Sequence, residues 1–166
     1  LWKMDIYIHS GDFYSFSRLT FNTEDEDALG SSGFRERLFS NKPFNPQQVS
    51  KLFDKVLTFY ENNGFPFASI KLDSIAFNNN QLSSRLLINK GPLIRIDTIF
   101  VKGESQNSNK LIYNILQINP DDIYQQQIIN QIEIRIKESP FLQSIKPSEY
   151  EFVNNKCNIY VYLKNK

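Results

Sequence analysis

Apolar and polar residues alternate along two stretches of the chain, and each stretch follows a glycine. The first covers residues 11–21 and the second covers residues 91–101. Successive side chains of a strand point to opposite faces, so each stretch predicts a β-strand with one buried face. In both stretches the alternation skips one residue at the same place, after Phe16 in the first and after Ile96 in the second. This shared irregularity predicts a β-bulge in each strand and an internal repeat.

Two helical patterns follow each of these strands. The longer one covers residues 46–60 in the first copy, where proline opens an unbroken apolar stripe at helical spacing. In the second copy it covers residues 128–136, with a less regular stripe. A shorter helix is predicted before each long one, at residues 34–39 and 110–116. The acidic segment 23–28 is predicted to be a solvated loop inserted in the first copy.

Each copy closes with a predicted β-hairpin. The strands are residues 69–77 and 82–89 in the first copy, and residues 149–153 and 158–163 in the second. Asparagines fill both turns, and Asn tolerates the positive φ that tight turns require. The order strand, two helices, hairpin predicts an α+β fold of two tandem β-α-α-β-β units. In each unit the two helices cover one face of a small sheet.

The repeat also predicts the domain boundaries. The first unit covers residues 11–90 and the second covers residues 91–166. Residues 5–10 match the last strand of a unit, so residues 1–10 are interpreted either as the last strand of a preceding unit or as a stray strand at a cut end. Lys90, Gly91 and Pro92 form the predicted inter-unit hinge, because Gly supplies a bend there and Pro stiffens the start of the next strand.

Composition excludes several classes of function. Net charge is +1, and both predicted units are balanced, so neither has the excess of Lys and Arg that a nucleic-acid binder needs. The single Cys157 cannot form an internal disulfide, and one His is too few for a metal cluster with cysteine. No apolar stretch approaches the length of a membrane-spanning helix. We therefore expect no nucleic-acid partner, no metal and no cofactor.

The chain has no catalytic constellation that the sequence reveals. No Ser/His/Asp or Cys/His spacing, glycine-rich phosphate loop or metal-ligand pattern occurs. Asp121 and Asp122 are interpreted as negative charges at the start of the second long helix rather than as an acid–base pair. The sequence predicts a protein that is not an enzyme.

Several of these features together resemble the POTRA domain, the polypeptide-transport-associated module of outer-membrane assembly and secretion proteins of the BamA-like family. The likeness covers roughly residues 11–166 and depends on the order of many weak matches. The matching pieces are Ile94, Ile96, Ile99, Val101 and Gly103 of one strand, residues 117–124, residues 60–68, residues 139–142 and Pro147.

The resemblance implies a three-stranded mixed sheet in each unit, with the first hairpin strand at an edge that receives segments of other proteins by strand addition. It implies a periplasmic location at the outer membrane, and a C-terminal barrel, absent from this chain, as the membrane attachment. Expected partners are unfolded outer-membrane proteins or assembly subunits. The predicted peptide-binding edge comprises Ser69, Ile70, Lys71, Leu72, Asp73, Ser74 and Ile75, and in second place Glu149, Tyr150, Glu151 and Phe152.

Two alternatives remain open at this point. The chain is a structural spacer or docking platform that never contacts client proteins, or it is a cell-division module with the same fold. Lys71 and Asp73 would then be charged residues that prevent pairing at an exposed edge.

Overall fold

The computed structural model describes residues 3–9, 11, 13–104 and 109–166. The chain divides into two compact units, of which the first comprises Leu1–Asp54 and Ile70–Leu87 and the second comprises Lys55–Ser69 and Ile88–Lys166. This grouping differs from the predicted one at residues 55–69 and 88–90, and the boundary at residues 90–92 stays a prediction. The described residues of the predicted opening strand, 5–9, have no regular secondary structure, and Ser10 lies outside the described residues.

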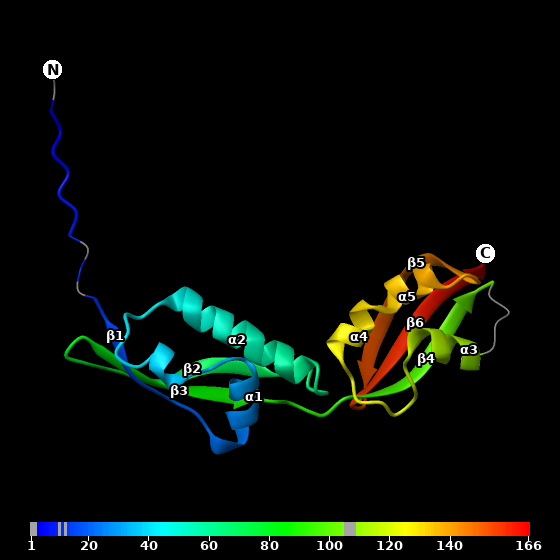
Figure 1. Ribbon diagram of the computed structural model, residues 1–166, viewed down its shortest axis with the longest axis horizontal. Coiled ribbons are helices and arrows are strands. Elements are labelled where there is room, and N and C mark those ends of the chain that lie inside the picture. Colours follow the sequence, from blue (N-terminus) through cyan, green and yellow to red (C-terminus); the bar gives the residue numbers. More distant parts are fainter. Residues whose placement is uncertain (1–2, 10, 12, 105–108) are drawn as a thin grey trace. The chain divides into compact units, whose positions relative to one another are not determined.

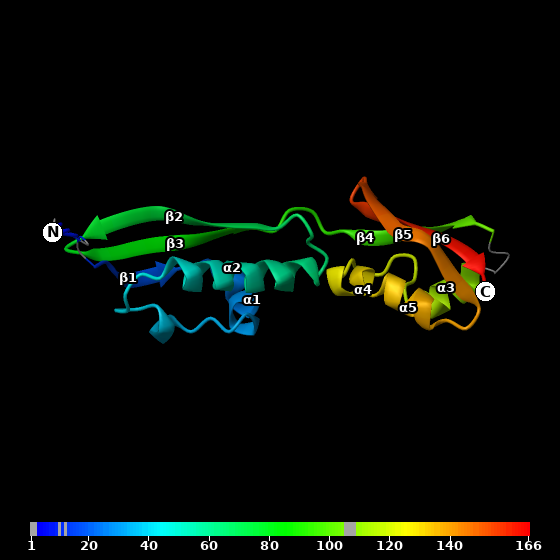
Figure 2. The same cartoon turned by 90° about the horizontal axis from the view of Figure 1, so that it is seen from above.

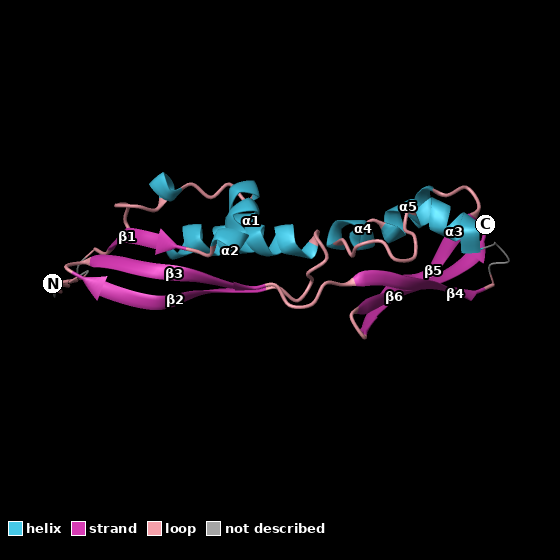
Figure 3. Cartoon of the chain, turned by 90° about the horizontal axis from the view of Figure 1, so that it is seen from below, coloured by secondary structure: helices cyan, strands magenta, loops and turns pink. Residues whose placement is uncertain are grey.

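The first sheet has the strand order β1-β3-β2, with β1 parallel to β3. Helices lie on one face of it, and the other face is left open (Figures 1 and 3). Its elements are β1 (Ser15–Thr20), the 3₁₀ turn η1 (Thr23–Asp25), α1 (Glu26–Ser31), the 3₁₀ turn η2 (Glu36–Leu38), α2 (Pro46–Glu61), β2 (Ser69–Asn78) and β3 (Gln81–Asn89).

The second sheet repeats the same topology, with the order β4-β6-β5, β4 parallel to β6 and β5 antiparallel to β6. Figure 2 shows its helices on one side of the strands. Its elements are β4 (Arg95–Gly103), α3 (Asn109–Leu116), α4 (Gln126–Asn130), α5 (Ile132–Glu138), β5 (Leu142–Val153) and β6 (Lys156–Asn165). The predicted α+β class, with two three-stranded mixed sheets and helices, is confirmed.

The irregularities that suggested a repeat are present in both first strands. The register of β1 against β3 shifts between Phe16 and Arg18, and that of β4 against β6 shifts between Ile96 and Ile99. Each extra residue restores the apolar side chains to the helix-covered face, where Phe16, Ile96 and Ile99 are buried. Both hairpin turns also agree with the prediction, since two successive Asn residues with positive φ close each one.

The predicted short helix at residues 34–39 is wrong. That stretch contains only the 3₁₀ turn η2, and α1 lies earlier, in the segment predicted to be an acidic loop. Carboxylates are favoured in the first turn of a helix by its positive end, so the acidic residues start this helix. Ala28 and Leu29 then pack into the core with 2% and 1% of their surface exposed.

The second long helix is interrupted, which the sequence did not predict. It consists of α4 and α5, separated at Gln131, which has φ −90° and ψ −8°. Gln131 is exposed there, whereas Ile129 and Ile132 on either side are buried. A polar residue in the middle of the apolar stripe is thus turned to solvent at the break. Ile134 points away from the core, as expected, and is 55% exposed.

Two further predictions need correction in the second unit. Strand β5 begins seven residues earlier than predicted and passes through Pro147, which edge strands and bulges tolerate. Asp121 and Asp122 do not lie in the first turn of a helix, because α4 starts only at Gln126. They form a turn in which the Asp122 Oδ2 atom accepts the Asn119 N–H at 2.7 Å.

Candidate functional site

The outer side of β1 is already paired with the loop that precedes α2. The Phe16 N–H donates to the Lys42 carbonyl at 2.9 Å, and the Phe16 carbonyl accepts the Asn41 N–H at 2.6 Å. The Phe44 N–H donates to the Tyr14 carbonyl at 2.8 Å. This lateral strand of the first sheet therefore has a main-chain partner within its own unit.

The second unit repeats this pairing 80 positions later along the chain. The Ile96 N–H donates to the Asp122 carbonyl and the Asp121 N–H donates to the Ile96 carbonyl, both at 2.8 Å. The Tyr124 N–H donates to the Ile94 carbonyl at 3.0 Å. The sequence did not predict that these loops pair with the first strand of each unit, although residues 117–124 belong to the resemblance. Aligning the loops of the two copies with an offset of 80 residues would have revealed the pairing.

Strands β2 and β5 form the opposite lateral edges of the two sheets. The structure places every residue of the predicted peptide-binding edge on these two strands. Ser69, Ile70, Lys71, Leu72, Asp73, Ser74 and Ile75 belong to β2, and Glu149, Tyr150, Glu151 and Phe152 belong to β5. Each unit thus has one lateral strand paired with its own loop and one lateral strand at an edge, and the predicted residues lie on the latter.

The β2 edge is irregular at its centre. Ser74 has φ +52°, which a non-glycine residue rarely adopts in a strand. Just before it, the Asp73 carbonyl accepts the hydroxyl of Ser84, a residue of β3, at 3.0 Å. Ile70 and Leu72 precede this point and are half-buried. The irregularity divides the edge into two short regular segments.

Beyond this irregularity the edge carries an exposed apolar patch formed by Ile75, Phe77 and Tyr14. Their side chains are 49%, 62% and 43% exposed, respectively. The Phe77 ring meets the Tyr14 ring edge-on at 5.4 Å. Tyr14 lies two residues before the buried Phe16 and thus on the same face of the sheet, the one that the helices cover. The patch therefore extends the apolar face of the sheet beyond the buried core.

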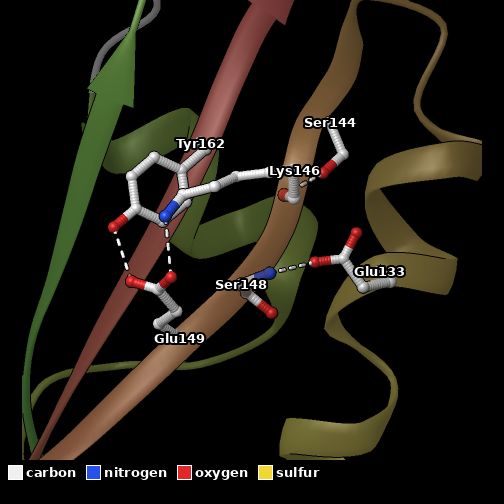
Figure 4. A network of polar contacts seen from close by, with 6 residues as sticks. All are labelled: Glu133, Ser144, Lys146, Ser148, Glu149 and Tyr162. Carbon is white, nitrogen blue, oxygen red and sulfur yellow. Dashed lines mark hydrogen bonds and ion pairs between the residues drawn. The ribbon is translucent and has the colours of Figure 1, made fainter.

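The β5 edge is bordered by an organised network of polar side chains. The Glu149 carboxylate accepts the Lys146 ammonium at 2.7 Å and the Tyr162 hydroxyl at 2.7 Å (Figure 4). The Lys146 ammonium also lies 3.7 Å from the centroid of the Tyr162 ring. The hydrogen bonds from Lys146 and Tyr162 hold the pKa of Glu149 below its ordinary value, and the bond to Glu149 raises the pKa of Lys146. All three side chains face solvent, so the network orients them and contributes little to stability.

The described residues contain few groups suited to chemistry. In residues 3–9, 11, 13–104 and 109–166, no three His, Cys, Asp or Glu side chains are grouped so that they could hold a metal ion. Cys157 lies fully buried in β6, and this burial raises the pKa of its thiol to about 12. A thiol that stays protonated is a poor nucleophile. Among the described helices, none combines the length and the apolar character that a membrane span requires.

The predicted hinge residues lie in the connection between β3 and β4. Gly91 has φ +70°, and its N–H donates to the Asn89 side-chain oxygen at 3.1 Å. The positive φ agrees with the expected bend, because glycine adopts this conformation without steric cost. The role of Lys90, Gly91 and Pro92 as a hinge stays a prediction.

Known proteins resemble the chain in sequence and in structure. The outer membrane protein assembly factor BamA of Buchnera aphidicola subsp. Acyrthosiphon pisum (strain APS) is 27% identical to it over 121 residues, which are 72% of this chain and 18% of that relative. No family model matches the chain. Among solved structures, BamA from Haemophilus ducreyi lacking POTRA domains 1-3 covers 93% of this chain and 30% of its own, with TM-score 0.65 and 12% identity. The chain has the fold of tandem POTRA domains.

A second solved structure supports the same conclusion. BamA POTRA3-5 from Haemophilus influenzae covers 96% of this chain and 69% of its own, with TM-score 0.59 and 16% identity. The resemblance to tandem POTRA domains of a BamA-like protein, which the sequence indicated, is thereby confirmed. The chain spans about a fifth of the BamA relative that it matches in sequence, 18% of its length.

Proposed function

We propose that this chain is the periplasmic, non-catalytic part of an outer-membrane protein assembly factor, and that its POTRA domains bind extended client or partner segments by strand addition. The observation that carries the proposal is the sheet topology. In each sheet one lateral strand, β1 or β4, pairs with a loop of the same unit, while the other lateral strand, β2 or β5, lies at the opposite edge. An edge strand offers main-chain donors and acceptors that pair with an extended peptide of almost any sequence.

The exposed apolar patch of Ile75, Phe77 and Tyr14 indicates which peptides suit the β2 edge. A strand added beside β2 places alternate side chains on the helix-covered side of the sheet, next to this patch. Apolar residues at those positions lose water there, while the polar residues between them stay exposed on the open face. The edge therefore favours segments with alternating apolar and polar residues, such as the strands of membrane barrels.

The affinity of one such edge is low. Four or five main-chain hydrogen bonds contribute about 0.5–1.5 kcal/mol each, and ordering the peptide offsets several kcal/mol of that. The dissociation constant then falls in the high micromolar to millimolar range. Two tandem units raise the effective concentration of edges around one polypeptide. Weak binding of this kind suits transfer of a client rather than its storage.

Residue-resolved titration tests the proposal. The ¹⁵N-labelled chain is titrated with a ten-residue peptide that alternates Val and Thr and has two Lys residues at each end. We expect concentration-dependent amide shifts along β2, strongest in Ser69–Asn78, with little change in α2. A control peptide of the same length and charge with Pro at every third position cannot pair as a strand and should cause no shifts. Shifts confined to the helices, or equal shifts with both peptides, would refute strand addition.

A second function, a docking platform for accessory subunits, is favoured by the open face of the second sheet. The Phe100 and Tyr160 rings stack there at 5.0 Å with 15° between their planes, and Tyr162 lies two residues further along β6. Exposed aromatic residues are enriched at protein interfaces. Replacing Phe100 by Ala should leave the peptide shifts along β2 unchanged if this face serves other partners. Loss of those shifts would mean that the open face of the second sheet and the β2 edge take part in the same binding event.

A further inference from the structure

Two main-chain groups of β5 between Ser144 and Ser148 already form hydrogen bonds with side chains. The Ser148 N–H donates to Glu133 Oε1 on α5 at 2.6 Å (Figure 4). The Lys146 carbonyl accepts the Ser144 hydroxyl at 2.7 Å. Pro147, which lies between Lys146 and Ser148, has no N–H. Three successive residues of the edge thus each have a main-chain group that is missing or already bound.

The same stretch is bent relative to its neighbour. The register of β5 against β6 shifts between Ser144 and Lys146 and again between Lys146 and Glu149. Bulges disrupt regular pairing and turn an edge away from an approaching strand. Past Glu149 the register with β6 continues without a shift to Val153. The register shifts and the bound main-chain groups therefore lie in the same stretch of β5, residues 144–149.

A groove of about 550 Å³ lies beside the start of β5. It is lined by Glu133, Lys137, Leu142, Gln143, Ser144 and Lys166. Glu133 belongs both to this groove and to the bond with the Ser148 N–H. Its carboxylate therefore stands where the carbonyl of an added strand would have to bind.

Strand β2 differs in this respect. Within the described part of the chain, no side chain accepts a main-chain N–H of β2. Among the described residues, the one side chain that binds the main chain of β2 is that of Ser84 on the adjacent strand β3, whose hydroxyl donates to the Asp73 carbonyl. An added strand therefore has no side chain to displace from a β2 donor.

We propose that Glu133 closes the β5 edge to strand addition along residues 144–148, so that an extended segment pairs with β2 and, in the second unit, only with residues 149–153. This proposal rests on the proposed function of the edges. The carboxylate forms a charge-assisted bond with the Ser148 N–H, which is stronger than the neutral bond that a peptide carbonyl offers in exchange. Glu133 thereby determines which edge of the tandem pair accepts a long segment.

The experiment compares Glu133→Ala, Glu133→Gln and the unchanged chain in the titration with the Val/Thr peptide. Removing the competing acceptor should tighten binding at β5 about tenfold and extend the amide shifts from residues 149–153 into residues 144–148. The Gln variant loses the same charge at the start of α5 but keeps an oxygen acceptor for Ser148. It should give a clearly smaller gain than the Ala variant, because a neutral acceptor still competes for the Ser148 N–H but less strongly than the carboxylate. A matched Ser144→Ala variant frees the Lys146 carbonyl and should give a smaller gain.

Each outcome decides between the two proposals. Shifts along β2 in all variants, with no gain at β5 in Glu133→Ala, would refute the role of Glu133 and leave the proposed function intact. An equal gain in the Ala and Gln variants would refute it as well, because the effect would then come from the lost charge and not from the acceptor. No shifts at either edge in any variant would refute both proposals. A gain at β5 that is larger in Glu133→Ala than in Glu133→Gln supports both.

Discussion

Gly103 at the end of β4 is required by the close packing of β4 against β6, and replacing it by Ala tests that packing. Gly103 has φ +102°, and an added Cβ would lie 2.5 Å from the Leu163 carbonyl oxygen and 2.7 Å from Ile145 Cδ1. The exposed Ile145 side chain can rotate away, whereas the Leu163 carbonyl belongs to the central strand. Relief of the clash therefore requires β4 to shift relative to β6.

The expected cost comes from two contributions. A side chain held at positive φ costs about 1–2 kcal/mol. Shifting the strand end weakens the pairing of Gly103 with Leu163, which adds about 0.5–1.5 kcal/mol. The sum of about 1.5–3.5 kcal/mol is a large fraction of the stability of a unit of this size, about 4–12 kcal/mol. The second unit should remain folded but unfold at a markedly lower urea concentration.

Two other glycines supply matched controls. Gly33 also has a positive φ, +80°, but an added Cβ would meet nothing within 4 Å, so Gly33→Ala should cost only the backbone contribution. Gly30 lies inside α1 with open space around it, so Gly30→Ala should stabilise the first unit by about 0.5–1 kcal/mol. Urea unfolding is followed by the amide peaks of Leu86 for the first unit and Ile159 for the second. The reasoning is refuted if Gly103→Ala costs no more than Gly33→Ala, or if the Ile159 transition does not move.

The remaining predictions concern Cys157, Asn45 and the connection at residues 90–92. Cys157 should resist iodoacetamide at pH 8 until the second unit unfolds, because burial raises its pKa from 9.0 to about 12, and rapid labelling of the folded chain would contradict this. Between these pH values the Cys157 thiol loses its proton in the unfolded chain and keeps it in the folded chain, so the stability of the second unit should fall as pH rises. Cys157→Ala should remove only part of this dependence, because burial also raises the pKa of Tyr124. Asn45→Ala should cost about 1 kcal/mol in thermal unfolding because its side chain accepts two N–H groups at the start of α2, whereas Asn45→Asp should cost far less. Replacing residues 90–92 with a flexible Gly/Ser stretch should change small-angle scattering while leaving each unit folded, and unchanged scattering would refute the hinge.

The sequence predicted those features that depend on alternation and on single special residues. The bulges after Phe16 and Ile96 were predictable because a strand that keeps one buried face must accommodate an extra residue where alternation slips. The Asn turns and the start of α2 at Pro46 were predictable because few residue types suit those conformations. The edge positions of β2 and β5 came from the resemblance to POTRA domains and were not derivable from composition or periodicity.

The errors have a common cause, which is that short segments depend on tertiary contacts. Helix α1 has only six residues and forms because Ala28 and Leu29 are buried by the rest of the unit, whereas its sequence alone reads as an acidic loop. The bond between Glu133 and the Ser148 N–H joins residues 15 positions apart on two elements, and neither residue carries a pattern that predicts it. Contacts of this kind become visible only when the topology places the elements side by side.

The difference between the two edges bears on how tandem units of one fold can act on a polypeptide. If both edges were equally open, a long extended segment would be held at two places at once, and its release would require both to open. The bound groups along residues 144–148 limit pairing at β5 to the five residues before the hairpin turn, whereas β2 offers a segment on either side of Ser74, residues 69–73 and 75–78, and has an apolar patch beside the second. The number of main-chain bonds that an edge can form scales with its available length, so β2 should hold a segment longer than β5 does. An unequal pair of this kind gives a bound segment a preferred site and a weaker second contact, and it allows release from β5 without release from β2.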